Sequence, residues 1–256
     1  MMVRVLSIAG SDSGGGAGIQ ADIKTITLLG GHAMTALTAL TAQNTCGVTM
    51  VEAISPAMVA AQIDACVSDI GVDAVKIGML GSPEIAAVVA DRLAALGVPV
   101  VFDPVMIATS GAVLADGATI AAFERLMALA SLTIPNVPEL AALGGDAAMR
   151  RRGIAYLAKG GDAEGPDVID RLIVPGRPDR AWTAPRIVTR HTHGTGCTLS
   201  SAIATRLGAG APLDQAVAEA RAFVRAALIA APGLGQGHGP MGHAALSSYQ
   251  SPVSSA

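Results

Sequence analysis

Two kinds of apolar pattern alternate along the chain. Short runs that are continuously apolar predict buried strands, and longer runs with apolar residues at every third or fourth position predict amphipathic helices. Strands are expected at residues 4–10, 72–78, 98–105 and 131–136. Helices are expected at residues 19–31, 55–71, 82–97, 116–130, 196–209 and 212–231. Strands and helices that alternate in this way favour an α/β fold, in which helices cover both faces of a mostly parallel sheet.

Local signals at the segment ends support this interpretation. The helices expected at 55–71 and 82–97 both open with Ser-Pro and end at a glycine, which matches an N-cap, a first-turn proline and a C-terminal stop. Residues 167–174 and 181–190 flank the turn sequence GRPD, and this pattern predicts a β-hairpin.

The composition changes this picture little but excludes several classes of protein. Of all residues, 51% are hydrophobic and only 2% are aromatic, and the net charge is −3. The charge argues against a nucleic-acid partner, and the basic run at 149–153 is interpreted as a solvated helix end. We expect one domain over residues 1–256, with a poorly ordered tail from about residue 244, because neither an internal repeat nor a linker interrupts the chain.

Targeting signals and cysteines add two expectations. No apolar run reaches the length of a membrane span, and the N-terminus lacks the apolar core of a signal peptide. We therefore expect a cytoplasmic protein without membrane contact. The cysteines at 46, 66 and 197 are odd in number and far apart, which argues against both a disulfide framework and a cysteine-rich metal site.

Polar and glycine-rich stretches follow most of the expected strands. They lie at 10–18, 78–79, 103–104, 136–139 and 194–197. Ligands of open α/β sheets bind beyond the carboxyl ends of the strands, so these stretches are expected to converge on one site. The loop at 10–18 fails the dinucleotide-binding motif because Ile19 stands where that motif needs glycine. Its five glycines favour close approach of the backbone to a ligand, and a flexible turn is the alternative.

The stretch at 194–197 predicts an anion pocket. Gly194, Thr195, Gly196 and Cys197 lead into the helix expected at 196–209, so some of their N–H groups lack partners inside that helix. Glycines allow these groups to point together toward an anion, and the helix dipole adds to the attraction. The same field is expected to lower the pKa of the Cys197 thiol and to favour the thiolate.

Three roles stay open for Cys197, namely nucleophile, general base and inert small residue. The phosphatase arrangement Cys-x5-Arg is absent, since position 203 is Ile. His191 and His193 lie too near Cys197 in the sequence to be assigned as a protease base. A base that deprotonates an alcohol beside a phosphate is the remaining catalytic role.

The motifs AGSDSGGGAGIQAD, TAQNT, AVKIGML, IPNVPEL, KGGD and HGTGCTLS occur in this order between residues 9 and 200. Together they resemble the hydroxymethylpyrimidine/phosphomethylpyrimidine kinases, the thiamine-biosynthetic branch of the ribokinase-like family. The likeness extends from residue 3 to about residue 243. Other branches generally carry Asp at the position of Cys197, so the cysteine points to the pyrimidine branch. The resemblance implies a ribokinase-like three-layer αβα sandwich with a central, mostly parallel sheet.

The resemblance also implies an activity. ATP, with Mg²⁺, would phosphorylate the hydroxymethyl group of 4-amino-5-hydroxymethyl-2-methylpyrimidine, and the same site would convert the monophosphate to the diphosphate. It further implies a small-molecule substrate and a homodimer. Two alternatives stay open: a pyridoxal or pyridoxine kinase of the same fold, and a non-catalytic pyrimidine-binding protein.

Individual positions take their roles from the resemblance. Gln43 matches the side chain that hydrogen-bonds the aminopyrimidine, whose edge suits an amide with both donor and acceptor. The other expected substrate contacts are Gly10, Met79 and Val105. Catalysis is assigned to Gly194, Thr195, Gly196 and Cys197. The nucleotide is assigned to Lys159, Asn136 and Glu139, and Mg²⁺, mostly through water, to Glu139, Asn136 and Asp103.

Simpler structural explanations exist for several of these residues. Met79 could belong to the core, and Asp103 could cap a turn. Asn136 and Glu139 could cap the next helix and do nothing more.

Two further features depart from a plain match. His238 and His243 are spaced like a metal pair but are interpreted as surface-loop histidines. The segment at 140–158 is shorter than is usual in the family by about one helix. Either a helix is trimmed there or residues are missing, which would disturb the local topology.

Overall fold

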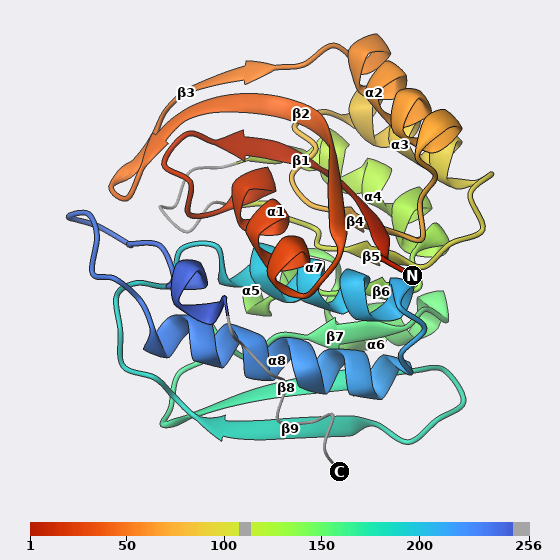
Figure 1. Ribbon diagram of the computed structural model, residues 1–256. Helices are drawn as coiled ribbons and strands as arrows, with labels where there is room; N and C mark the ends of the chain where they lie inside the picture. Colours follow the sequence, from red (N-terminus) through yellow and green to blue (C-terminus); the bar gives the residue numbers. More distant parts are fainter. Residues whose placement is uncertain (108–113, 248–256) are drawn as a thin grey trace.

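The computed structural model describes residues 1–107 and 114–247, and these residues build a single sheet between two helical layers (Figure 1). The sheet has nine strands in the order β3-β2-β1-β4-β5-β6-β7-β8-β9. The strands are β1 Arg4–Asp12, β2 His32–Asn44, β3 Gly47–Ala53, β4 Ala74–Ile77, β5 Val100–Phe102, β6 Leu132–Thr133, β7 Tyr156–Ala158, β8 Asp167–Ile173 and β9 Arg180–Pro185. Pairing is parallel from β2 to β7 and antiparallel at both edges.

The helices begin where the local sequence supplies caps. They are α1 Gly18–Leu28, α2 Pro56–Asp69, α3 Pro83–Leu93, α4 Gly117–Leu129, α5 Val137–Ala142, α6 Gly145–Arg152, α7 Thr195–Gly208, α8 Leu213–Ile229 and the 3₁₀ turn η1 His243–Leu246. Ser55 and Ser82 accept hydrogen bonds from backbone N–H groups in the first turns of α2 and α3. Each of these helices also begins with proline, so the Ser-Pro openings act as expected.

Alternate residues of the central strands face the two helical layers. Leu6 and Ile8 of β1 pack in a core with α2, α3 and α4. Val5, which precedes Leu6 in the sequence, packs in a second core with α1, α7 and α8. Figure 1 shows these two helix groups on opposite sides of the sheet. The expected three-layer αβα sandwich is confirmed.

The structure contains three strands that the sequence pattern does not predict. β2 consists mainly of Ala and Thr, whose small side chains give a weak contrast between its two faces. β3 is exposed over most of its length, so it carries no apolar run. β7 has three residues, too few for a period to show. The predicted hairpin exists as β8 and β9, although its second strand ends at Pro185 instead of residue 190.

The segment at 140–158 holds a complete connection. It contains the end of α5, the eight residues of α6, and β7, which pairs with both β6 and β8. The expectation of a disturbed topology is therefore wrong. The short helices α5 and α6 make the connection, and the sheet remains continuous. At the C-terminus, η1 extends to Leu246, and residues 248–256 of the expected tail lie outside the described residues.

Candidate active site

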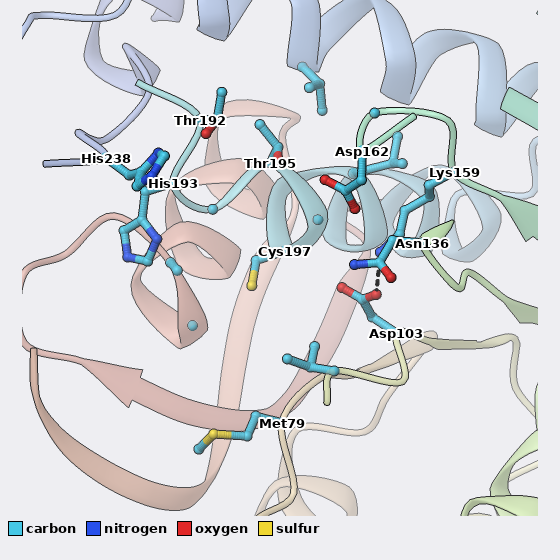
Figure 2. Close-up of a pocket in the computed structure, with 18 of the residues that line it drawn as sticks. Met79, Asp103, Asn136, Lys159, Asp162, Thr192, His193, Thr195, Cys197 and His238 are labelled. Carbon is cyan, nitrogen blue, oxygen red and sulfur yellow. Dashed lines mark hydrogen bonds and ion pairs between the residues drawn. The ribbon is translucent and has the colours of Figure 1, made fainter. Parts of the chain in front are cut away.

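A cavity of about 720 Å³ opens at the carboxyl ends of the parallel strands. Its wall includes every residue that the sequence assigned to substrate, nucleotide, metal or catalysis. These are Gly10, Gln43, Met79, Asp103, Val105, Asn136, Glu139, Lys159, Gly194, Thr195, Gly196 and Cys197. The convergence expected for strand ends of an open sheet therefore occurs, and it joins residues from most of the chain length. Figure 2 shows Cys197 in the middle, with His193 on one side and Asp103 and Lys159 on the other.

The first turn of α7 presents free backbone N–H groups to the cavity. Gly194 has a φ of +87° and packs against the backbone oxygen of Gly16, so a side chain at 194 would be both strained and blocked. The N–H of Thr195 donates to Thr192. Among the described residues, the N–H groups of Gly196 and Cys197 have no backbone acceptor. The turn thus has the donors that an anion pocket requires.

The expected thiolate at Cys197 is wrong for the protein without ligands. Burial raises the pKa of Cys197 to about 11; Lys76 acts against this rise, and the carboxylates of Asp22 and Asp103 add to it. A desolvated thiol surrounded by two carboxylates keeps its proton, and the helix N-terminus does not offset this.

A buried ion pair that the sequence analysis missed underlies this part of the wall. Lys76 and Asp22 are fully buried, with Nζ 2.8 Å from Oδ2. Ser7 and Ser201 donate to the same carboxylate at 2.5 Å and 2.7 Å. A side chain at position 78 would collide with Lys76 Nζ, so Gly78 leaves the room that the ammonium needs in the cavity wall. The signal was present in the sequence, because Lys76 interrupts an otherwise apolar strand.

A second charged cluster lies beside Gly196. Lys159 Nζ is 2.7 Å from Asp103 Oδ1 and 3.7 Å from Glu139 Oε2. Burial raises the pKa of Glu139 to about 7; Lys159 opposes this effect and Asp103 adds to it. Two carboxylates therefore share one lysine in a buried place, which leaves negative charge for a further cation.

Asn136 and Glu139 form a reciprocal capping box at the start of α5. Glu139 N–H donates to Asn136 Oδ1 at 2.9 Å, and Asn136 N–H donates to Glu139 Oε2 at 2.8 Å. Asn136 and Glu139 therefore cap the next helix, as the structural explanation of these residues predicts. The capping box uses only one carboxylate oxygen of Glu139, so the other stays available to a ligand.

At the opposite end of the cavity, Gln43 sits in a hydrogen-bonded network. His193 Nε2 lies 2.9 Å from Asp12 Oδ2 and 3.2 Å from the Gln43 amide. Asp12 also accepts the N–H groups of Gly14, Gly16 and Ala17, so it fixes the glycine loop. The sequence analysis missed both roles, because Asp12 and His193 are 181 positions apart.

Apolar side chains pack closely at this end of the cavity. Met79 is 9% exposed, and its terminal methyl group occupies the space that a side chain at Gly10 would need. Val105, in the segment after β5, also lines the cavity. The two histidines near the C-terminus differ in exposure. His238 is exposed at the rim of the cavity, whereas His243 is buried, with its Nε2 3.0 Å from Thr198 Oγ1. The surface-loop interpretation is thus wrong for His243.

The side of the cavity beyond Lys159 was not predicted. It is lined by β8, by the segment after β9 and by one face of α8, through Val168, Ile187, Arg221, Val224 and Leu228. Arg221 forms a buried ion pair with Asp170 at 2.6 Å. This part of the cavity is mainly apolar with an arginine at its edge, and it can receive a second ligand.

The sequence also matches known proteins. The family model described as phosphomethylpyrimidine kinase matches residues 12–242. A hydroxymethylpyrimidine/phosphomethylpyrimidine kinase of Rhizobium meliloti is 48% identical over 95% of this chain and 97% of its own length. A thiamine biosynthesis bifunctional protein of Geobacter sulfurreducens is also 48% identical, and this chain spans 52% of it.

Solved structures show the same relationship. The pyridoxal kinase of Bacillus subtilis, solved with ADP, superposes with a TM-score of 0.87 at 32% identity, covering 97% of this chain and all of that one. A phosphomethylpyrimidine kinase of Clostridium difficile superposes with a TM-score of 0.75 at 36% identity, covering 88% and 99%. No helix within the described part of the chain is long and apolar enough to cross a membrane.

Proposed function

The chain belongs to the phosphomethylpyrimidine kinase family, and from this premise we propose that it phosphorylates an aminopyrimidine alcohol with ATP. The substrate is 4-amino-5-hydroxymethyl-2-methylpyrimidine, and a second turnover converts the monophosphate to the diphosphate. Relatives that carry this activity in their names share up to 48% of the sequence over nearly the full chain. The activity places the protein in thiamine biosynthesis, as with the named relatives.

One observation carries the proposal. A single cavity holds a side-chain amide at one end, a charged cluster at the other, and the free N–H groups of α7 with a thiol between them. Phosphoryl transfer depends mainly on positioning and on neutralising charge, and this arrangement supplies both. The alcohol oxygen forms a bond to the γ-phosphorus, the bond to ADP breaks, and the alcohol proton leaves.

Cys197 is placed to receive that proton. It must first lose its own proton, which Lys76 favours and the neighbouring carboxylates oppose. The monophosphate needs no such base, because its attacking oxygen is already ionised near pH 7. Gln43 holds the ring so that the hydroxymethyl group points at the turn of α7.

We extend the proposal to Mg²⁺. The donor set fits a hard cation, since Asp103 and Glu139 supply carboxylate oxygens and carry more negative charge than Lys159 neutralises. Among the described residues, no group of three or more His, Cys, Asp or Glu forms a complete metal site. Water and phosphate oxygens would complete the coordination, and the ion would neutralise charge on the transferred phosphoryl group. A homodimer, implied by the resemblance, completes the proposal and is measured by analytical ultracentrifugation.

The pyridoxal kinase alternative deserves comparison. The pyridoxal kinase of B. subtilis superposes better than the C. difficile phosphomethylpyrimidine kinase, by TM-score 0.87 against 0.75. Sequence identity favours the pyrimidine kinases, at 48% against 32%. Identity reports on side chains over the whole chain, whereas superposition reports mainly on the backbone, and the higher identity makes the pyrimidine the better substrate assignment.

A coupled assay of ADP release tests the proposal. The panel contains the aminopyrimidine alcohol, its monophosphate, pyridoxal, pyridoxine and a reaction without acceptor. We expect turnover with the first two and a much lower kcat/KM with the vitamin B6 compounds. A preference for pyridoxal would show that the substrate is a vitamin B6 compound instead. Absence of ADP release with every acceptor would rule out the enzymatic function.

A further inference from the structure

The amide of Gln43 lies between two groups whose hydrogen-bonding capacity is already partly used. On one side, Thr41 Oγ1 is 3.1 Å from one end of the amide. On the other side, His193 Nε2 is 3.2 Å from the opposite end. The two ends of an amide differ only in O and NH₂, so a half-turn of the group exchanges them, and the neighbours decide which end faces which.

In the structure Gln43 Oε1 faces Thr41 and Gln43 Nε2 faces His193. The Thr41 hydroxyl carries one proton, and two acceptors compete for it: the carbonyl oxygen of Ser11 at 2.8 Å and Gln43 Oε1 at 3.1 Å. The shorter contact takes the proton, so Thr41 can only accept from the amide, and a half-turn of the amide satisfies it. The Thr41 oxygen therefore needs a donor from Gln43, and the NH₂ end of the amide must face it.

His193 leads independently to the same orientation. Its Nε2 lies 2.9 Å from a carboxylate oxygen of Asp12, and His193 is 6% exposed. A bare nitrogen lone pair against a buried carboxylate would set two acceptors against each other, so Nε2 carries the proton. Burial acts to raise the pKa of Asp12, but hydrogen bonds from His193 and from the backbone N–H groups of Ala17 and Gly14 hold it below its usual value, which keeps the group a carboxylate. A protonated Nε2 requires the oxygen end of Gln43.

We infer that Thr41 and His193 lock the Gln43 amide in one polarity, and that His193 is a specificity-determining positioning residue for the ring of the substrate. The inference rests on the proposed function. After these bonds, Gln43 retains one N–H and one oxygen lone pair in a fixed order. The hydroxymethyl group must point to α7, so the ring cannot turn over to suit a different order.

The fixed order separates the two substrate classes. In the aminopyrimidine, the group beside the hydroxymethyl carbon is an amino donor, followed by a ring-nitrogen acceptor. In pyridoxal, the group at that position is a carbonyl acceptor, followed by a phenolic oxygen. A locked amide oxygen attracts the amino group and repels the carbonyl, whereas an amide free to turn would present its NH₂ to the carbonyl. A site that fixes a polar partner discriminates by leaving the wrong ligand unpaired.

The test compares conservative and non-conservative variants at the two locking residues. His193→Gln keeps an N–H donor near the Nε2 position, and His193→Leu removes it. Thr41→Ser keeps the acceptor, and Thr41→Val removes it. His32→Leu, on an exposed histidine, is the matched control. For each purified protein, kcat/KM is measured with the aminopyrimidine alcohol and with pyridoxal, and KM is measured for ATP.

We expect His193→Leu and Thr41→Val each to lower the ratio of kcat/KM for aminopyrimidine to that for pyridoxal by about three- to tenfold, the size of one lost hydrogen bond. His193→Gln, Thr41→Ser and His32→Leu should keep the ratio, and KM for ATP should not move. An unchanged ratio in both His193→Leu and Thr41→Val overturns the inference, as does an equal fall in His193→Gln and His193→Leu. If His193→Leu does not fold, the Thr41 pair decides alone. Failure of the wild type to use the aminopyrimidine would instead defeat the proposed function.

Discussion

Single residues in this cavity take their chemistry from charges contributed by distant parts of the chain. Cys197 sits at a helix N-terminus, which favours a thiolate, yet burial together with Asp22 and Asp103 raises the pKa of its thiol to about 11. Lys76 is the counterweight, and it is itself held by Asp22 at 2.8 Å. Charges of both signs therefore act on the pKa of the thiol, and each charged residue can be substituted to measure its effect.

Cys197→Ala is expected to separate the two phosphorylation steps. The alcohol must lose a proton to attack, and a positioned base contributes about 10²–10⁴-fold to such a step. The monophosphate is already ionised, so its phosphorylation should be spared. Cys197→Asp should restore part of the alcohol activity, because a carboxylate accepts a proton from a similar place. Single-turnover rates on both substrates make the comparison, and equal slowing of the two steps would leave Cys197 a packing element.

Lys76→Met should raise the pKa of Cys197 further, because it removes the charge that favours the thiolate. The pH dependence of Cys197 alkylation by iodoacetamide, followed by peptide mass spectrometry, measures this directly without any substrate. Asp22→Asn should shift the profile the opposite way, because Lys76 then acts unopposed.

The double variant Asp22→Asn with Lys76→Met controls for the unpaired buried charge that Lys76→Met leaves behind. It should fold better than Lys76→Met alone. A Cys197 alkylation profile that is identical in all of these proteins would show that the ion pair has no influence on the thiol.

At the scale of elements, the site depends on where helices begin and on what anchors them. α7 begins at a glycine turn that a side chain at 194 would block, and α5 begins at a capping box that also faces the cavity. η1 anchors α7 to α1, because His243 Nε2 contacts the hydroxyl groups of Thr25 in α1 and Thr198 in α7. Helix starts and their anchors therefore set the site's shape.

Gly196→Val should reduce kcat by well over tenfold while the circular dichroism spectrum stays the same. A Cβ at 196 would lie 3.2 Å from Asp103 Oδ2 and 3.4 Å from Lys159 Nζ, so the added methyl groups would enter the space between the charged cluster and the turn. The matched control is Gly117→Val, at the start of α4, where nothing lies within 4 Å of a Cβ. Turnover near the wild-type value in Gly196→Val would exclude the turn from phosphoryl binding.

His243 should make the protein sensitive to acid. Burial lowers the pKa of His243 to about 4 from 6.5, so the folded state binds this proton less readily than the unfolded state. The contribution to stability is present above pH 6.5 and is lost as the pH falls toward 4. Between pH 7.5 and pH 4.5 it amounts to about 2–3 kcal/mol.

Urea unfolding at pH 7.5 and 4.5 measures this contribution. His243→Gln lacks the titration and can still bond Thr198, so the stability it loses on acidification should be smaller than in the wild type. His32→Gln, on an exposed histidine, should behave like the wild type. If His243→Gln loses as much stability as the wild type on acidification, another group is responsible.

The cavity is a property of the whole molecule, because it lies at the carboxyl ends of parallel strands from many parts of the chain. Its wall draws on β1, β2, β4 and β8, on the segments that follow β4, β5, β6, β7 and β9, and on α1, α5, α7 and α8, so no single part of the chain can form it alone. A ligand that binds this wall binds only the folded chain. Its binding free energy should therefore appear as stability of the entire fold.

ADP with Mg²⁺ at 100 times its Kd should raise the free energy of unfolding by about 2.7 kcal/mol. Gln43→Leu should keep this gain in full, because residue 43 lies at the opposite end of the cavity. The same variant should lose most of the gain given by an unreactive aminopyrimidine that lacks the hydroxyl group, through about 1–3 kcal/mol of weaker binding. Urea unfolding with each ligand checks both, and equal losses for the two ligands would make Gln43 a structural residue.

Features that depend on neighbours along the chain were predictable from the amino-acid sequence. Apolar runs and amphipathic periods located the central strands and the main helices, and Ser-Pro openings marked the starts of α2 and α3. Motif positions identified the residues that line the cavity, because the carboxyl ends of parallel strands must share one edge of a sheet. Periodicity and capping are local, so a sequence shows them directly.

Properties that depend on distance through space came from the folded arrangement of the chain. It placed β2 against β1, closed the sheet through the three residues of β7, and brought His193 to Asp12. It also reversed the expected ionisation of Cys197, since burial and the charges of Asp22 and Asp103 outweigh the helix N-terminus and Lys76. Electrostatic energy and desolvation are set by what surrounds a group, and for these residues the surroundings come from segments far away in the sequence.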